Sequence, residues 1–104
     1  MIGGGPYIVE FKESAKSDLV ELEKFIVEDC HAPLTAKRRF ADLDKRLDWI
    51  EKYAELPAID FNLRYQYSLL VRTIPYGKKM VIVYAVEGEK VYILRIMPQS
   101  MIIF

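Results

Sequence analysis

Hydrophobic side chains recur at helical spacing in the first half of the chain. Apolar positions between residues 15 and 54 form two stripes with steps of three or four: Ala15, Leu19, Leu22, Ile26 and Cys30, then Ala36, Phe40, Leu43, Leu47, Ile50 and Ala54. This spacing predicts two amphipathic helices. The second helix should begin at Pro33, because proline is tolerated only in a first turn, and end near Leu56-Pro57. A linker this short makes the pair an antiparallel helix hairpin.

Polar residues near the helix starts are candidate caps. Ser14 is placed to cap the first helix, and Asp18 follows early in that helix, where the helix dipole favours a negative charge. Thr35 would cap the second helix if that helix starts slightly later than Pro33.

After residue 60 the spacing of apolar residues changes from helical to alternating. Three strands are predicted, at residues 65–73, 80–86 and 91–97, with turns at Pro75-Tyr76-Gly77 and Glu87-Gly88-Glu89. The middle run is apolar on both faces, which is typical of a central strand covered on both sides.

A shorter alternating run at residues 6–11 predicts a fourth strand, before the helices. It must pair with the other three, because a lone strand is unstable. We therefore expect an α+β domain: an N-terminal strand, an antiparallel two-helix hairpin and a three-stranded antiparallel meander, with the hairpin covering one face of the sheet. Residues 6–104 are expected to form this single domain, and residues 1–5 a flexible tail.

Composition favours a cytoplasmic globular protein. The 104 residues are 52% hydrophobic and 29% charged, which suits a folded domain with one core. The single cysteine, Cys30, cannot form an internal disulfide, and this favours a reducing compartment. No apolar run approaches the ~18 residues of a membrane span. The opening MIGGGPY lacks the basic start of a secretory signal, so we expect no membrane partner.

Charge is balanced overall but uneven along the chain. Fifteen basic and fifteen acidic residues cancel, and the isoelectric point is 6.6. Domains that bind nucleic acid on their own usually have an isoelectric point above about 9. Residues 1–59 hold nine basic and twelve acidic residues, whereas residues 60–104 hold six and three. The first half is therefore acidic and the second half mildly basic.

Four stretches, in this order, resemble the RelE/ParE superfamily, the toxins of bacterial type II toxin–antitoxin modules. They are YIVEFKESAKSDLVELEKFI, APLTAKRRFADLDKRLDWI, ELPAI and VRTIPYGKKMVIVYAVEGEKVYILRI, and Tyr84 lies where the family usually has a tyrosine in its central strand. The resemblance implies a cognate antitoxin as partner. It also implies one of two activities: RelE-like members cut messenger RNA on the ribosome, whereas ParE-like members inhibit DNA gyrase and are not nucleases.

The residues needed for RNA cleavage are incomplete. Cleavage without a metal needs a general base, a general acid and a cation that stabilises the developing charge. In an alignment on Tyr84, Val81 stands where RelE-like enzymes carry an arginine, and Met97-Pro98-Gln99-Ser100 stands where they carry a basic or histidine-containing stretch. Neither Gln99 nor Ser100 titrates near neutral pH.

The sequence therefore favours a ParE-like toxin of a plasmid stabilisation module, which inhibits gyrase and is not an enzyme. The alternative is a RelE-like mRNA endonuclease with an atypical site, whose partners would be the ribosome and mRNA. A third interpretation is a decayed member that retains only antitoxin binding. A homodimer is also compatible with the sequence.

Polar residues of the second half form the candidate functional surface: Arg72, Lys78, Lys79, Tyr84, Arg95 and Gln99. Both arginines are expected on the sheet face away from the helices, where each would be solvated or bind a phosphate. Tyr84 is expected to pack rather than to catalyse, and His31 to lie in a surface linker. No metal-ligand spacing or phosphate-binding glycine loop is present, so neither a metal nor a cofactor is expected.

The chain ends on four apolar residues, Met101, Ile102, Ile103 and Phe104, where termini are usually polar. We expect this segment either to cap the core or to bind a partner.

Overall fold

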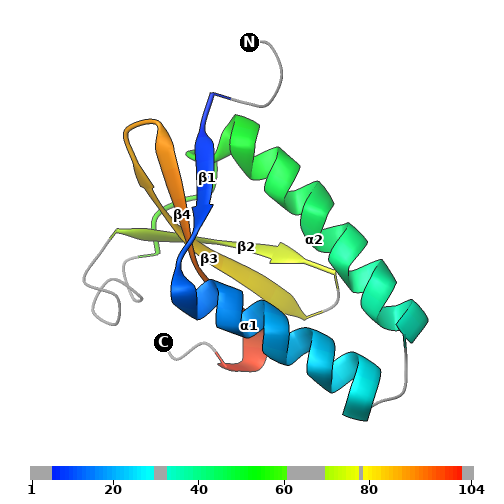
Figure 1. Ribbon diagram of the computed structural model, residues 1–104. Coiled ribbons are helices and arrows are strands. Elements are labelled where there is room, and N and C mark those ends of the chain that lie inside the picture. The colour runs from blue at the N-terminus through cyan, green and yellow to red at the C-terminus, as the bar shows by residue number, and fades with distance from the viewer. Residues whose placement is uncertain (1–5, 30–32, 61–69, 78, 102–104) are drawn as a thin grey trace.

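The computed structural model describes residues 6–29, 33–60, 70–77 and 79–101, which form one sheet and two helices (Figure 1). The four strands are β1 (Ile8–Phe11), β2 (Val71–Tyr76), β3 (Met80–Glu87) and β4 (Lys90–Pro98), in the spatial order β1-β4-β3-β2. Strands β2, β3 and β4 form an antiparallel meander, and β1 pairs with β4 in parallel. The predicted α+β architecture is confirmed.

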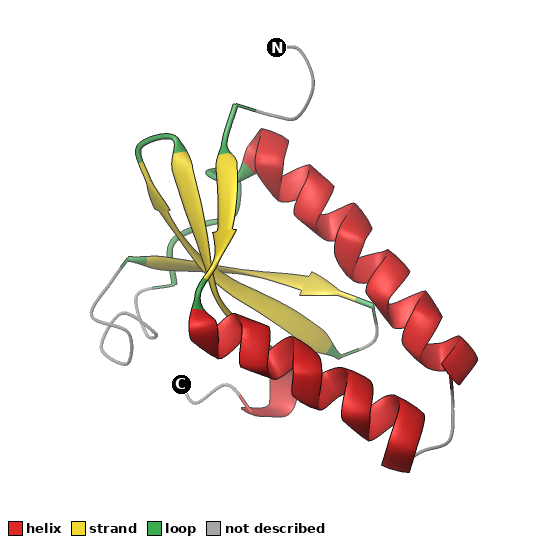
Figure 2. Cartoon of the chain, viewed as in Figure 1, coloured by secondary structure: helices red, strands yellow, loops and turns green. Residues whose placement is uncertain are grey.

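Two helices cover one face of this sheet (Figure 2). They are α1 (Glu13–Lys24), which continues into a π-helical turn, η1 (Phe25–Asp29), and α2 (Pro33–Tyr53); a short 3-10 helix, η2 (Gln99–Met101), follows β4. The predicted start of α2 at Pro33 is confirmed, and Thr35 lies inside the helix rather than at its cap. None of the helices in the described ranges is long and apolar enough to cross a membrane.

Apolar side chains are buried on both faces of the sheet. The larger cluster lies between sheet and helices and comprises Ala15, Leu43, Ile50, Ala54, Ile74, Tyr76, Met80, Ile82, Tyr84, Val91, Ile93 and Ile96. The second cluster lies on the other face and comprises Val71, Val81, Val83, Ala85, Leu94 and Met97. Because successive strand residues point to opposite faces, β3 contributes to both clusters. This confirms that it is a central strand buried on both sides.

Strand β2 extends further than the sequence predicted. The expected turn at Pro75-Tyr76-Gly77 is wrong, since β2 continues through Tyr76, and residues 65–69 of the predicted strand lie outside the described residues. Pro75 is tolerated because β2 is an edge strand, where one side of the backbone needs no partner. The turn lies later: Gly77 has a φ of 53° and Lys79 a φ of 58°.

Helix α1 takes the place of a strand along part of β4. β1 ends at Phe11 while β4 continues to Pro98, so the rest of β4 has no strand on that side. The Ser14 hydroxyl donates a hydrogen bond across this gap to the carbonyl oxygen of Leu94 (2.6 Å). The prediction that Ser14 caps the helix is therefore wrong, because Lys12 occupies the N-cap position.

Candidate functional site

Two residues of the predicted functional surface contact the end of α2. Nη1 of Arg72 donates hydrogen bonds to the carbonyl oxygens of Glu55 (3.0 Å) and Pro57 (2.5 Å), and the Tyr84 hydroxyl donates one to that of Ala54 (2.7 Å). The bond to Ala54 satisfies a carbonyl at the end of the helix, and those to Glu55 and Pro57 hold the segment that follows it. Arg72 lies opposite Tyr84 in the β2–β3 pairing, and both side chains therefore point toward the helices. The prediction that Arg72 faces away from them is wrong.

Arg95 also contacts α1. Its register opposite Val83 of the second cluster agrees with the predicted face, but its guanidinium is paired with a carboxylate rather than solvated. Its Nε and Nη2 donate hydrogen bonds to the two carboxylate oxygens of Asp18 (2.7 and 3.1 Å). Asp18, which was expected to act through the helix dipole, also accepts the backbone N–H of Ile96 (2.8 Å). The β3–β4 register shifts between Val83 and Tyr84. Irregularities of this kind redirect neighbouring side chains, and spacing alone does not reveal them.

Lys79 and Gln99 are two other members of the predicted surface that lie close together. The backbone N–H of Gln99 donates a hydrogen bond to the carbonyl oxygen of Lys79 (2.7 Å), and both residues line the same cleft. Lys78 lies outside the described residues, as do residues 102–104 of the predicted partner-binding segment. Met101 ends η2.

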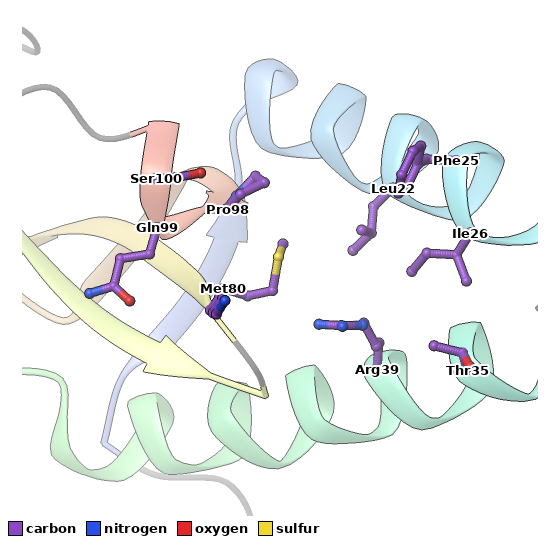
Figure 3. Close-up of a pocket in the computed structure, with 10 residues that line it drawn as sticks. Leu22, Phe25, Ile26, Thr35, Arg39, Met80, Pro98, Gln99 and Ser100 are labelled. Carbon is purple, nitrogen blue, oxygen red and sulfur yellow. The ribbon is translucent and has the colours of Figure 1, made fainter. Parts of the chain in front are cut away.

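This cleft, of about 810 Å³, opens between the two helices and the ends of β3 and β4 (Figure 3). Its lining comes from three parts of the fold: Leu22, Phe25 and Ile26 from α1 and η1, Thr35 and Arg39 from α2, and Lys79, Met80, Pro98, Gln99 and Ser100 from the strand ends and η2. Leu22 and Ile26 reach into it from one helix, Arg39 from the other and Met80 from the sheet.

The sequence analysis did not predict the cleft. The backbone N–H of Phe25 is shared between the carbonyl oxygens of Glu21 and Leu22, and there α1 widens into η1. Such π-helical turns are frequent at functional sites. In the sequence, Phe25 only flanks the helical stripe, and spacing does not show that its side chain stays 56% exposed.

The cleft suits binding better than catalysis. Arg39 and Lys79 are the ionisable side chains among its described lining residues, and both are basic. Within the described ranges, no three His, Cys, Asp or Glu side chains are grouped so that they could bind a metal. Val81, which stands at the RelE arginine position, is buried in the second cluster. The cleft can therefore hold apolar side chains together with an anionic group.

Tyr76 is a buried residue beneath the helices that the sequence analysis did not single out. Its side chain is 3% exposed, and its hydroxyl forms no hydrogen bond with any described residue. Burial raises the pKa of Tyr76 to about 12; the charge of Arg39 lowers this pKa and that of Asp18 raises it. The hydroxyl is therefore within electrostatic reach of both helices.

Comparisons with known proteins agree with this fold. The family described as the ParE toxin of the type II toxin-antitoxin system, parDE, matches residues 9–103. A chain in a solved structure of the chromosomal ParDE TA system from P. aeruginosa is similar with a TM-score of 0.66 and 18% identity, covering 88% of this chain and 95% of that chain. At this identity the likeness shows the fold alone. No curated protein matches the chain. Because the family match covers nearly the whole sequence, the chain belongs to the ParE family of toxins of type II toxin–antitoxin systems.

Proposed function

We propose that this ParE-family toxin inhibits DNA gyrase by binding to it and does not cleave RNA. The observation that carries this proposal is that both strand arginines make contacts within the fold. Arg72 binds carbonyl oxygens of the segment that follows α2, and Arg95 pairs with Asp18. Neither guanidinium is therefore placed to stabilise charge on a phosphate during cleavage. The burial of Val81 in an apolar cluster on the second sheet face supports the same proposal.

We further propose that a cognate antitoxin neutralises the toxin by filling the cleft between the helices. Apolar concavities that remain open in an isolated chain are typical interaction sites. Leu22, Phe25 and Ile26 supply one apolar wall, and Met80 lies opposite. Residues 101–104 follow directly after cleft-lining Ser100, so we include this apolar segment in the partner-binding surface.

Two assays on the purified chain test the choice between gyrase and RNA. At micromolar concentration it should inhibit DNA supercoiling by gyrase, and it should leave messenger RNA intact in a translating extract. Addition of the antitoxin should restore supercoiling. Supercoiling that is unaffected by the toxin, or transcripts cut at ribosomes, would contradict the proposal.

A pair of matched variants tests the antitoxin site. Phe25 in the cleft and Val20 on α1 are both exposed, at 56% and 66%, so replacing either with aspartate leaves the core intact. Phe25→Asp should weaken antitoxin binding by at least about tenfold, because an apolar anchor is replaced by a charge in a desolvated contact. Val20→Asp, which lies outside the lining of the cleft, should bind normally. Equal effects of the two variants would place the antitoxin elsewhere.

A further inference from the structure

Two basic residues line the cleft and form what we call its basic end. Arg39 and Lys79 lie among lining residues that are otherwise uncharged in the described part of the chain. Arg39 already interacts with another group of the protein, and this interaction restricts the position of its guanidinium. Lys79 is exposed and forms no ion pair with the described residues. The apolar walls and the basic end together match a segment that carries an acidic side chain next to apolar ones.

The turn between β2 and β3 lies beside the side chain of Arg39. A Cβ atom at Gly77 would lie 4.0 Å from Nη1 of Arg39, and Lys79 is two residues further along the same turn. The Asp42 carboxylate is also near, at 3.6 Å from that Cβ position, and offsets part of the Arg39 charge. Lys79 therefore attracts an anion more strongly than Arg39 does. The hydrogen bond from Gln99 to its carbonyl oxygen fixes the turn to the end of β4.

The backbone of Lys79 gives a second reason to assign it a role. Its φ of 58° lies in the left-handed region, which glycine and asparagine adopt at lower cost than lysine. Strained conformations of this kind are concentrated at ligand-binding positions. A lysine here keeps a long cationic side chain at the cleft at some expense in stability.

We infer that the basic end of the cleft selects the antitoxin by binding a carboxylate in the antitoxin segment, beside the apolar side chains that enter the cleft. This inference rests on the proposed occupation of the cleft by the antitoxin. An ion pair at the rim of an interface mainly sets partner choice and association rate. Lys79 is thus a specificity-determining residue, while Leu22, Phe25 and Ile26 supply most of the affinity.

The test uses the full chain and, as probe, the purified protein encoded by the reading frame adjoining its gene. Affinity is measured at low and high salt for Lys79→Asn, for Lys79→Arg, which keeps the charge, and for Lys52→Asn, an exposed control on α2 outside the cleft. Lys79→Asn should bind about two- to fivefold more weakly, with a shallower salt dependence. Its melting temperature should be equal to or above that of the parent, because asparagine tolerates a positive φ.

Lys79→Arg and Lys52→Asn should both bind with the affinity of the parent chain. Replacing acidic residues of the probe with lysine, one at a time, should identify one position at which Lys79→Glu restores binding. If the probe binds and Phe25→Asp disrupts binding while Lys79→Asn has no effect on affinity or salt dependence, the inference is wrong and the proposed antitoxin site stands. If the probe does not bind the parent chain at all, both fail.

Discussion

Replacing Asp18 with alanine should destabilise the protein more than its exposure suggests. Asp18 connects α1 to the stretch of β4 that has no strand beside it, by accepting two hydrogen bonds from Arg95 and one from the backbone N–H of Ile96. Its side chain is 15% exposed and that of Arg95 is 32% exposed. Alanine would leave the Ile96 N–H without its acceptor and the guanidinium without its partner.

The magnitude follows from these contacts. A hydrogen bond to a charged group contributes about 1.5–3 kcal/mol. The ion pair adds up to about 1 kcal/mol, because the guanidinium of Arg95 keeps part of its hydration. We therefore expect the free energy of unfolding to fall by about 3 kcal/mol, which for a domain of this size lowers the melting temperature by about 10–20 °C. Asp18→Asn keeps an acceptor for Ile96 and should lose about half as much.

Urea denaturation followed by the fluorescence of Trp49, the single tryptophan, measures these differences. Glu13→Ala is the matched control on the same helix, since Glu13 forms only an exposed pair with Lys16 and should contribute less than about 0.5 kcal/mol. A double-mutant cycle of Asp18→Ala with Arg95→Met isolates the ion pair. The reasoning is refuted if Asp18→Ala costs no more than Glu13→Ala, or if the two sites in the cycle are independent.

Two buried tyrosines give the remaining predictions. Tyr84→Phe should lower the free energy of unfolding by about 1–2 kcal/mol, because the Ala54 carbonyl loses its donor. Tyr76→Phe should leave the free energy of unfolding unchanged or raise it, because the Tyr76 hydroxyl bonds no described residue. A larger loss from Tyr76→Phe than from Tyr84→Phe in the same urea assay would contradict this. Burial raises the pKa of both side chains to about 12, so the unfolded chain loses these protons first and stability should be lost as pH rises from about 10 to 12. Each phenylalanine variant should show a weaker alkaline decline, and identical pH profiles in all three proteins would argue against ionisation of these groups.

Features of the fold that depend on a single helix or strand were predicted correctly from the sequence. Helical spacing identified both helices and their buried stripes, including Ala15, Leu43 and Ile50. A run that is apolar on both faces identified β3 as the central strand. These predictions succeed because burial of one face imposes a period of 3.6 or 2 on the sequence, whatever the element contacts.

Contacts between elements were not predictable in the same way. Ser14 looks like a helix cap until the early end of β1 gives it a carbonyl of β4 as partner. Arg72 looks like a solvent-facing residue until the register of β2 directs it to the helices, and Arg95 looks like one until α1 supplies Asp18 as its partner. Ser14 and Arg72 bind backbone carbonyl groups, and Arg95 binds a carboxylate, and the positions of all three acceptors depend on the whole topology. Of the two lysines assigned to the functional surface, Lys79 lines the cleft, because turn residues keep their side chains outside the core, and Lys78 lies outside the described residues.

The cleft itself follows from a mismatch in length between the helix stripes and the sheet. The end of α1 and the start of α2 project past the ends of β3 and β4 (Figure 1). Leu22 and Ile26 continue the apolar stripe there and line the open cleft. A partner segment that fills the cleft would cover this apolar surface. It would stabilise the fold by a free energy that grows with the logarithm of its concentration, about 2.7 kcal/mol at a hundredfold excess over Kd. Toxin bound to antitoxin should therefore resist unfolding well beyond free toxin.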